Sequence, residues 1–317
     1  MIPDITIRGE NGFDLRANAD DATTNPNAPL YILDGVEVSA ERIYDMDLNR
    51  VESTTILKDA SATALYGSRG ANGVIVITTI RPKAGQIRIN LNANYNVSIP
   101  DLRDYNLMNA REKLQFETLA GVYTDKSNSA INQVRLDSLR NARLKGIEEG
   151  IDTYWLSVPL RTGFTHKHNL YAEGGEENIR YGIGLSYGNV QGVMKGSDRQ
   201  TISGNIDLIY RSGKFQFSNK LTVDYMETND PSVSFSEYAQ ANPYYKKYNE
   251  DGGIDKYLYY YSGDGYEEKV ANPLWNASLN NYDKSDETGF TNNFIIEWFA
   301  TDDLRARGKF GITKTSS

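Results

Sequence analysis

The chain has 317 residues, a formal net charge of −8 and no cysteine. The acidic balance argues against a nucleic-acid partner, which needs a concentrated basic surface, and the absence of cysteine excludes disulfides, thiolate metal sites and a cysteine nucleophile. No apolar stretch approaches the roughly 18 residues of a membrane-spanning helix, a test that does not detect the alternating strands of a membrane barrel. Composition alone, with 22 tyrosines, also suits a soluble β protein.

The first residues, MIPDITIRGENG, contain neither the basic segment nor the apolar core of a signal peptide. A protein of the outer membrane is exported through such a signal. We therefore expect that the chain begins after a processing or truncation point, unless it is not a membrane protein.

The first predicted elements are short strands. Residues 29–34 predict a strand, and Asp34 with Gly35 suits a tight hairpin turn. Residues 36–38 begin the return strand, and residues 50–57 predict another.

A short helix and a buried strand follow. Asp59 is a good N-cap for an alanine-rich helix ending near Leu65, and Gly67 fits the position just past its end, where a positive φ is common. The β-branched run at 73–80 has no alternation, which is typical of a strand buried on both faces. Residues 1–82 thus form a small mixed α/β unit.

After Pro82 the hydrophobic period becomes two. Residues 86–99 alternate apolar and polar side chains without an error, which makes a far longer strand than the ~5–6 residues of an ordinary one. The same alternation returns at 164–174, 179–188, 201–210, 215–225, 290–298 and 304–312. We therefore expect about seven long strands.

The connections between these strands are unequal. Those at 211–214 and 300–303 are tight, whereas those at 100–163 and 229–286 are long. Helix-like stretches lie at 106–121 and 131–149. Short turns at one end and long loops at the other are typical of an outer-membrane barrel, as are aromatic side chains on the apolar face near strand ends. Such aromatic residues are Tyr95, Tyr187, Tyr210, Tyr225 and Trp298.

Several motifs resemble one known family. Residues 29–36 (PLYILDGV), 50–60 (RVESTTILKDA) and 61–79 (SATALYGSRGANGVIVITT) closely resemble the plug of SusC/RagA-family TonB-linked transporters. Residues 152–175 and 179–195 resemble the barrel strands that follow the plug in this family. The resemblance implies a small α/β plug domain at 1–82, followed at 83–317 by antiparallel strands of a partial transmembrane β-barrel: about seven strands of the roughly 22 in such a barrel.

The resemblance also implies a function and partners. The expected activity is TonB-dependent import of an oligosaccharide or oligopeptide across the bacterial outer membrane, gated by the plug and assisted by a SusD-like surface lipoprotein acting as a lid. The loops at 100–163 and 229–286 would be extracellular. We expect no signal peptide, additional N-terminal domain or TonB-contacting segment before Met1, and seven strands would leave two open edges that lipid does not tolerate. We therefore expect no transport by this chain alone.

The resemblance assigns the plug motif a structural or gating role. Its residues are Asp34, Gly35, Lys58, Asp59, Tyr66, Gly67, Arg69, Gly70 and Gly73. The charges of Lys58, Asp59, Arg69 and Arg81 predict helix capping and salt bridges between plug and barrel, or contacts that switch the plug. The glycine spacing does not fit a phosphate-binding loop, because the segment follows a helix and opens a strand.

The second long loop contains the candidate ligand or lid contacts. They are Tyr257, Tyr259, Tyr260, Tyr261 and Tyr266, since aromatic faces stack on sugars and pack on peptides. Packing between loops is the equally weighted alternative. His166 and His168 share one strand face, but no third metal ligand is placed by the sequence.

No catalytic constellation, cofactor motif or metal site rises above background, so we do not expect an enzyme. Two other classes stay open. One is a TonB-dependent receptor that senses substrate and signals, and the other is a soluble β-rich binding or adhesion protein.

Overall fold

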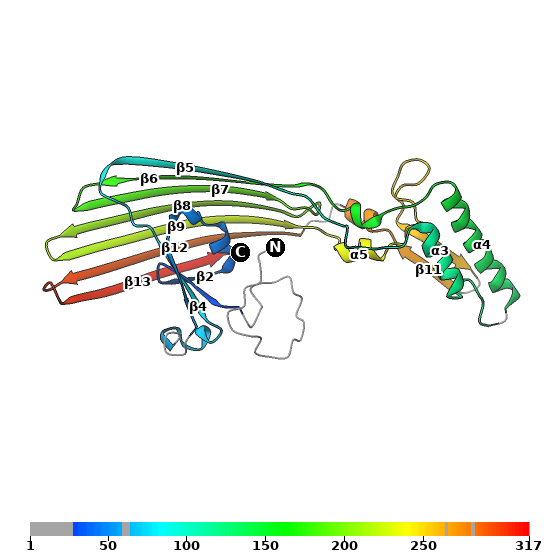
Figure 1. Cartoon of the computed structure of the whole chain (residues 1–317), viewed down its shortest axis with the longest axis horizontal. Coiled ribbons are helices and arrows are strands. Elements are labelled where there is room, and N and C mark those ends of the chain that lie inside the picture. Colours follow the sequence, from blue (N-terminus) through cyan, green and yellow to red (C-terminus); the bar gives the residue numbers. More distant parts are fainter. Residues whose placement is uncertain (1–27, 59–63, 128, 264–265, 280–282, 317) are drawn as a thin grey trace.

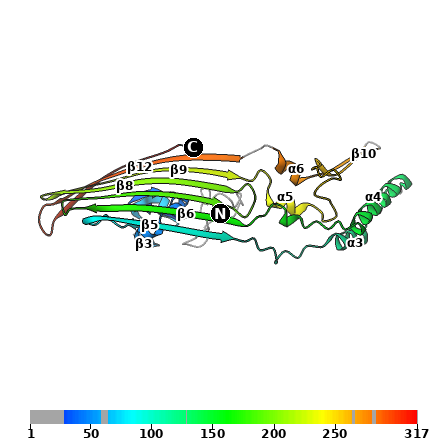
Figure 2. The ribbon, with the colours of Figure 1, turned by 90° about the horizontal axis from the view of Figure 1, so that it is seen from above.

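The computed structural model describes residues 28–58, 64–127, 129–263, 266–279 and 283–316. Figure 1 shows a curved sheet of long strands, a small unit lying against one side of it, and an arm of helices and a hairpin beyond one end of the strands. The view from above in Figure 2 shows the same arm continuing the long axis of the sheet.

The small unit has a four-stranded sheet in the order β2-β1-β4-β3. Its strands are β1 (Leu30–Leu33), β2 (Val36–Val38), β3 (Val51–Leu57) and β4 (Val74–Thr79). β1 and β2 form the predicted antiparallel hairpin, and β4 lies parallel to β1 between it and β3. Val74, Ile75 and Ile77 are buried, which confirms the prediction of a strand covered on both faces.

Among its described residues, this unit also contains one α-helix and two 3₁₀ helices. Helix α1 (Ala40–Asp45) begins at Ser39, whose side chain accepts from the backbone N–H of Arg42. The 3₁₀ helices are η1 (Leu48–Arg50) and η2 (Ala64–Gly70), and Gly67 inside η2 has the expected positive φ, 65°. The proposed helix cap Asp59 and the residues up to 63 lie outside the described part of the chain. α1 packs Ile43 against a core of Tyr31, Ile75 and Ile77.

The large sheet is antiparallel throughout, in the order β13-β12-β9-β8-β7-β6-β5. Its strands are β5 (Gly85–Ser98), β6 (Gly163–Gly175), β7 (Ile179–Gln191), β8 (Asp198–Ser212), β9 (Phe215–Asp230), β12 (Asp283–Phe299) and β13 (Arg305–Ser316). The number of long strands agrees with the sequence prediction. β12 and β9 reach further than predicted, so the second long connection is shorter than 229–286.

The two faces of this sheet differ in polarity. One face carries large apolar side chains that are exposed, from 36% for Tyr187 to 71% for Leu91. This face also includes Ile89, Tyr95, Leu185, Ile206, Leu208, Val223, Phe294, Ile296, Trp298 and Ile312. The opposite face buries polar residues instead: Asn169, Glu173, Asp207, Gln216, Thr222, Asn293 and Glu297. Within the described residues no second sheet covers the apolar face, as a soluble sandwich would require.

The connections divide between the two ends of the sheet. The predicted turns between β8 and β9 and between β12 and β13 lie at one end, together with a third tight turn between β6 and β7. The arm leaves the other end (Figure 1).

The arm is a folded unit with its own helices, hairpin and buried core. Its elements are α3 (Ala110–Leu119), α4 (Ala130–Glu148), the 3₁₀ helix η3 (Trp155–Ser157), α5 (Phe235–Gln240), β10 (Tyr257–Gly263), β11 (Tyr266–Ala271) and α6 (Pro273–Ser278). The buried residues of its core are Ala110, Trp155, Val233, Tyr238, Tyr244 and Tyr245, drawn from both long connections. None of the described helices is long and apolar enough to cross a membrane.

Candidate functional site

The principal candidate site is the contact between the small α/β unit and the polar face of the large sheet. A cavity of about 840 Å³ lies between them, lined from one side by residues of β2 and α1 and from the other by strands β6, β7, β8, β9, β12 and β13. The contacts around this cavity are ion pairs and hydrogen bonds, described below. Such contacts can be exchanged for water at lower cost than an apolar interface of the same size.

Asp34 lies at the centre of this contact. It is the first residue of the β1–β2 turn and has a left-handed backbone, with φ of 50°. Its carboxylate accepts from the backbone N–H and hydroxyl of Thr79 at 2.8 and 2.7 Å, and from the Lys220 ammonium at 2.6 Å. Burial alone would raise the pKa of Asp34, but Lys220 and the hydrogen bonds from Thr79 hold it below its ordinary value of 3.8. Asp34 thus joins the β1–β2 turn to β4 within the small unit and also binds this unit to β9.

Helix α1 provides a second set of ion pairs. Arg42 pairs with Asp224 of β9, and Asp45 lies 2.5 Å from Arg199 of β8. Lys167 of β6 donates to the backbone carbonyl of Tyr44 at 2.9 Å and has Asp45 3.9 Å away. One short helix therefore contacts three strands of the sheet, β6, β8 and β9.

Arg50 and Tyr171 make a third contact. The Arg50 guanidinium carbon lies 3.4 Å from the centre of the Tyr171 ring, and the same guanidinium donates to the Ile80 carbonyl at 2.7 Å. The ring occupies the space opposite Gly182, where an added Cβ would lie 1.9 Å from the Tyr171 hydroxyl. Glycine on β7 thus makes room for a side chain of the adjacent strand β6, rather than leaving open space.

The plug-motif residues named from the sequence separate into two groups. Asp34 and its neighbour Gly35 lie at the contact, where the Lys309 ammonium donates to the Asp34 carbonyl at 2.9 Å. Arg69 instead pairs with Glu37 inside the small unit, and Lys58 is exposed. Tyr66, Gly67 and Gly70 belong to η2, and Gly73 has a φ of 101° just before β4.

The prediction that Lys58, Arg69 and Arg81 form salt bridges to the sheet is wrong for the described residues. The residues that do so are Asp34, Arg42, Asp45, Lys167, Arg199, Lys220 and Asp224. The sequence feature that could have indicated these ion pairs is the charge at inward positions of the alternating strands, such as Lys220 and Asp224. A strand facing only water in a lumen would also carry such charges, so the sequence does not single out a partner.

The tyrosines of the β10–β11 hairpin are divided between two faces. A register shift between Tyr257 and Tyr259 places Tyr257 on the face of Tyr260, and the two rings stack with centroids 5.6 Å apart. Tyr259 packs against the arm core, and Tyr261 lies under the guanidinium of Arg135 at 5.1 Å. Tyr266 begins β11. Of the proposed ligand contacts, Tyr257 and Tyr260 form a stacked pair on the face away from the arm core, with Tyr260 exposed and Tyr257 half-buried.

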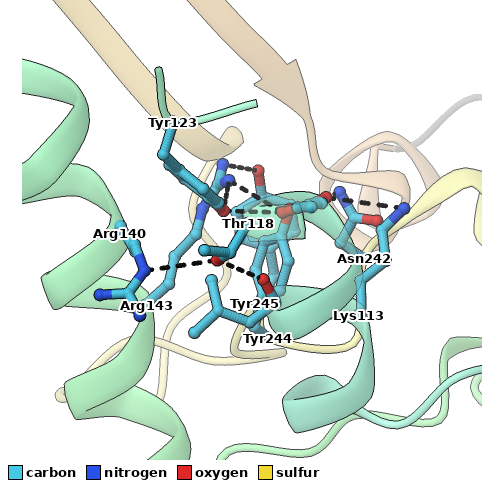
Figure 3. Close-up of polar contacts among 10 residues, drawn as sticks. Lys113, Thr118, Tyr123, Arg140, Arg143, Asn242, Tyr244 and Tyr245 are labelled. Carbon is cyan, nitrogen blue, oxygen red and sulfur yellow. Dashed lines mark hydrogen bonds and ion pairs between the residues drawn. The ribbon is translucent and has the colours of Figure 1, made fainter. Parts of the chain in front are cut away.

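A buried ion pair lies beneath this hairpin (Figure 3). The Glu117 carboxylate accepts from the hydroxyls of Tyr123 at 2.7 Å and Tyr244 at 3.0 Å, and Arg143 donates to Tyr123 at 2.6 Å and to Tyr245 at 3.1 Å. Glu117 and Arg143 are 3.5 Å apart. Burial and the neighbouring carboxylate raise the pKa of Tyr123 to about 12. Sequence analysis missed this cluster, because its members come from two separate loops.

His166 and His168 lie on the exposed apolar face, next to rings of Tyr95 and Tyr187. They are not inner polar residues of the sheet. No group of three or more potential metal ligands occurs among the described residues.

Comparison with known proteins agrees with the geometry. Residues 2–74 match the TonB-dependent Receptor Plug Domain family. The chain is 28% identical to TonB-dependent receptor P26 of Formosa agariphila over 90% of its length, and 25% identical to TonB-dependent receptor SusC of Bacteroides thetaiotaomicron over 95%. It spans 27% and 31% of the lengths of these two relatives.

The fold is shared with a solved transporter. The RagAB peptide importer in its closed-closed state superposes with a TM-score of 0.71 over 91% of this chain and 35% of the other, at 23% identity. The open-open state gives a TM-score of 0.69. The plug family match, the similarity along almost the whole chain and the common fold show that this chain resembles SusC and RagA, with a plug and an unclosed antiparallel sheet like those of TonB-dependent transporters.

Proposed function

We propose that this chain supplies the plug and seven barrel strands of a TonB-dependent importer of the bacterial outer membrane. We assign residues 1–82 to the plug and 83–317 to the barrel, with the connections at about 100–163 and 229–286 on the extracellular side. The exposed apolar face would contact lipid, and the polar face would line the lumen. The role is transport, without catalytic residues.

The observation that carries this proposal is the polar contact between plug and sheet. A plug that must move repeatedly needs contacts that water can replace, and ion pairs such as Asp34–Lys220 and Asp45–Arg199 meet this need. An apolar interface of equal area would have to expose its surface to water at about 25 cal/mol per Å². TonB, by pulling on the plug, would exchange these ion pairs for hydrated charges and widen the existing cavity.

The substrate and lid are further parts of the proposal. RagAB is a peptide importer, and SusC is a TonB-dependent receptor. We propose that this chain handles an oligosaccharide or an oligopeptide and works with a SusD-like surface lipoprotein. The arm, with its stacked tyrosine pair, is the surface that both would meet first.

The membrane placement can be tested with the tryptophans of the chain, which has three. Trp298 lies on the exposed face of β12, 43% exposed, and Trp155 is buried in the arm. In the intact protein reconstituted with brominated lipids, a variant retaining only Trp298 should be strongly quenched. A variant retaining only Trp155 is the matched control and should not be. Equal emission from Trp298 in brominated and ordinary lipid would refute the proposal.

A further inference from the structure

The two long connections share more than a core. The backbone N–H of Thr153, in the first connection, donates to the carbonyl of Pro243 in the second at 2.8 Å. The Thr153 hydroxyl donates to the Tyr245 carbonyl at 2.8 Å, and the Trp155 indole N–H to the Asn242 carbonyl at 3.0 Å. These bonds join residues about ninety positions apart, so the two connections pack against each other through defined backbone and side-chain contacts.

Hydrogen bonds to the buried ion pair also join the two connections. Glu117 and Arg143 both belong to the first connection, on α3 and α4. Both residues also bond to the second connection: Tyr244 donates to Glu117, and Tyr245 accepts from Arg143. Figure 3 shows the side chains of Arg143, Tyr244 and Tyr245 lying side by side, with the Arg143 guanidinium carbon 4.4 Å from the centre of the Tyr244 ring. Separating the two connections would break both of these hydrogen bonds to charged groups, which are stronger than bonds between neutral groups.

The same arginine also supports the hairpin. The Arg143 guanidinium carbon lies 5.8 Å from the Tyr259 ring centre, and on the next turns of α4 Arg135 lies over Tyr261 and 3.6 Å from Glu268. These contacts occupy the inward face of the β10–β11 hairpin. The opposite face, with the stacked Tyr257 and Tyr260, is thereby turned outward.

We propose that the two connections move as a single rigid arm, and that Arg143 is the positioning residue that fixes the outward orientation of the Tyr257–Tyr260 pair. Two independent flexible loops would have to be ordered by each arriving substrate or lid, at an entropic cost to binding. A preformed arm avoids that cost and transmits a displacement at the hairpin to α3 and α4. This inference rests on the proposed function only in naming a substrate or lid as what contacts the arm.

Distance measurements between spin labels test the proposal in the intact protein in lipid bilayers. Because the chain has no cysteine, Asn141→Cys on α4 and Ser262→Cys on β10 give a unique labelled pair across the boundary. Asn141→Cys with Gln115→Cys on α3 reports the order of the first connection alone. All three positions are exposed. We expect a single narrow distance for both pairs.

Two variants and one control test which contacts hold the two connections together. Tyr244→Phe with Tyr245→Phe removes the hydroxyls that cross the boundary while keeping the packing of the rings. Tyr123→Phe removes a hydroxyl bonded to the same ion pair but within the first connection. The double variant should broaden the Asn141–Ser262 distances, with a roughly fivefold gain in the separated population for each lost bond, and Tyr123→Phe should not.

Arg143→Met removes the cation and should broaden the Asn141–Ser262 distances further, while the Asn141–Gln115 distance stays defined. A broad Asn141–Ser262 distribution in the unmodified protein would overturn the rigid arm. An unchanged distribution in both the Arg143→Met and double tyrosine variants would overturn the role of Arg143. Either result leaves the lipid-quenching test of the membrane placement unaffected, so the two proposals fail separately.

Discussion

The Lys220 ammonium lies 2.6 Å from the Asp34 carboxylate although 186 positions separate the two residues in the chain. Asp34 shapes the hairpin of the plug, and Lys220 is an inward residue of the barrel-type sheet. The same carboxylate therefore serves a local turn and a contact between two folding units. This double role makes Asp34 the most informative position for testing how the plug is held.

Replacing Asp34 with Asn should loosen the plug without disrupting its turn. Asn tolerates the left-handed backbone of this position but cannot pair with the charge of Lys220. We expect a loss of about 1–3 kcal/mol in the free energy that holds the plug on the sheet, limited by the second contact of Lys220 with Asp207 at 3.9 Å. The measurement is the rate at which a bulky hydrophilic maleimide labels Ser203→Cys, which lines the cavity.

A matched control is available inside the plug. Arg69→Gln breaks the ion pair with Glu37, which does not reach the sheet and is exposed. Labelling of Ser203→Cys should stay unchanged in this variant. Equal acceleration by Asp34→Asn and Arg69→Gln would mean that the plug unfolds rather than detaches.

Acid should release the same contact. The pKa of Asp34 is lowered below 3.8 in the folded protein, so its stabilising contribution is complete above that pH and is lost as the pH falls through the lowered pKa. A spin label at Ser203→Cys should therefore gain mobility only below about pH 4. In the Asp34→Asn background this transition should be absent; its persistence would assign it to another carboxylate.

Gly182→Ala should disturb the contact between Arg50 and Tyr171. The added methyl would lie 1.9 Å from the Tyr171 hydroxyl, forcing the ring away from the guanidinium above it. Overpacking of this kind costs about 1–3 kcal/mol. Gly308→Ala on β13, whose Cβ would meet nothing within 4 Å, is the control. Gly182→Ala should lower the midpoint of thermal unfolding in lipid more than Gly308→Ala does. Similar midpoints would contradict this account of Gly182.

A charge on the apolar face should hinder membrane assembly. Leu185 is 57% exposed near the middle of β7. Leu185→Arg should destabilise the folded protein in a bilayer by about 2–4 kcal/mol, because an arginine there would face hydrocarbon. Tyr260→Arg, at an exposed position of the arm, should have little effect. Reversible urea unfolding in lipid vesicles compares them; an unaffected Leu185→Arg protein would place that face in water.

Much of this architecture can be read directly from the chain. The period of two in residues 86–99 and its later repeats specify long strands, because one face must be apolar along its whole length. The turn at Asp34 and Gly35 and the unbroken apolar run of β4 are likewise local signals. Their interpretation requires only neighbouring residues, so the sequence by itself determined the strand content, the order of plug and sheet, and the family resemblance.

The partners of individual side chains depended on tertiary structure. Lys167, Arg199 and Lys220 look alike as inward charges, and only strand register brings them to α1 and Asp34. The register shift at Tyr257 separates an outward tyrosine pair from its packed neighbours, and Glu117 meets Tyr244 across 127 positions. Such pairs leave no periodic trace in the chain, because contact between distant residues is fixed by how whole elements pack.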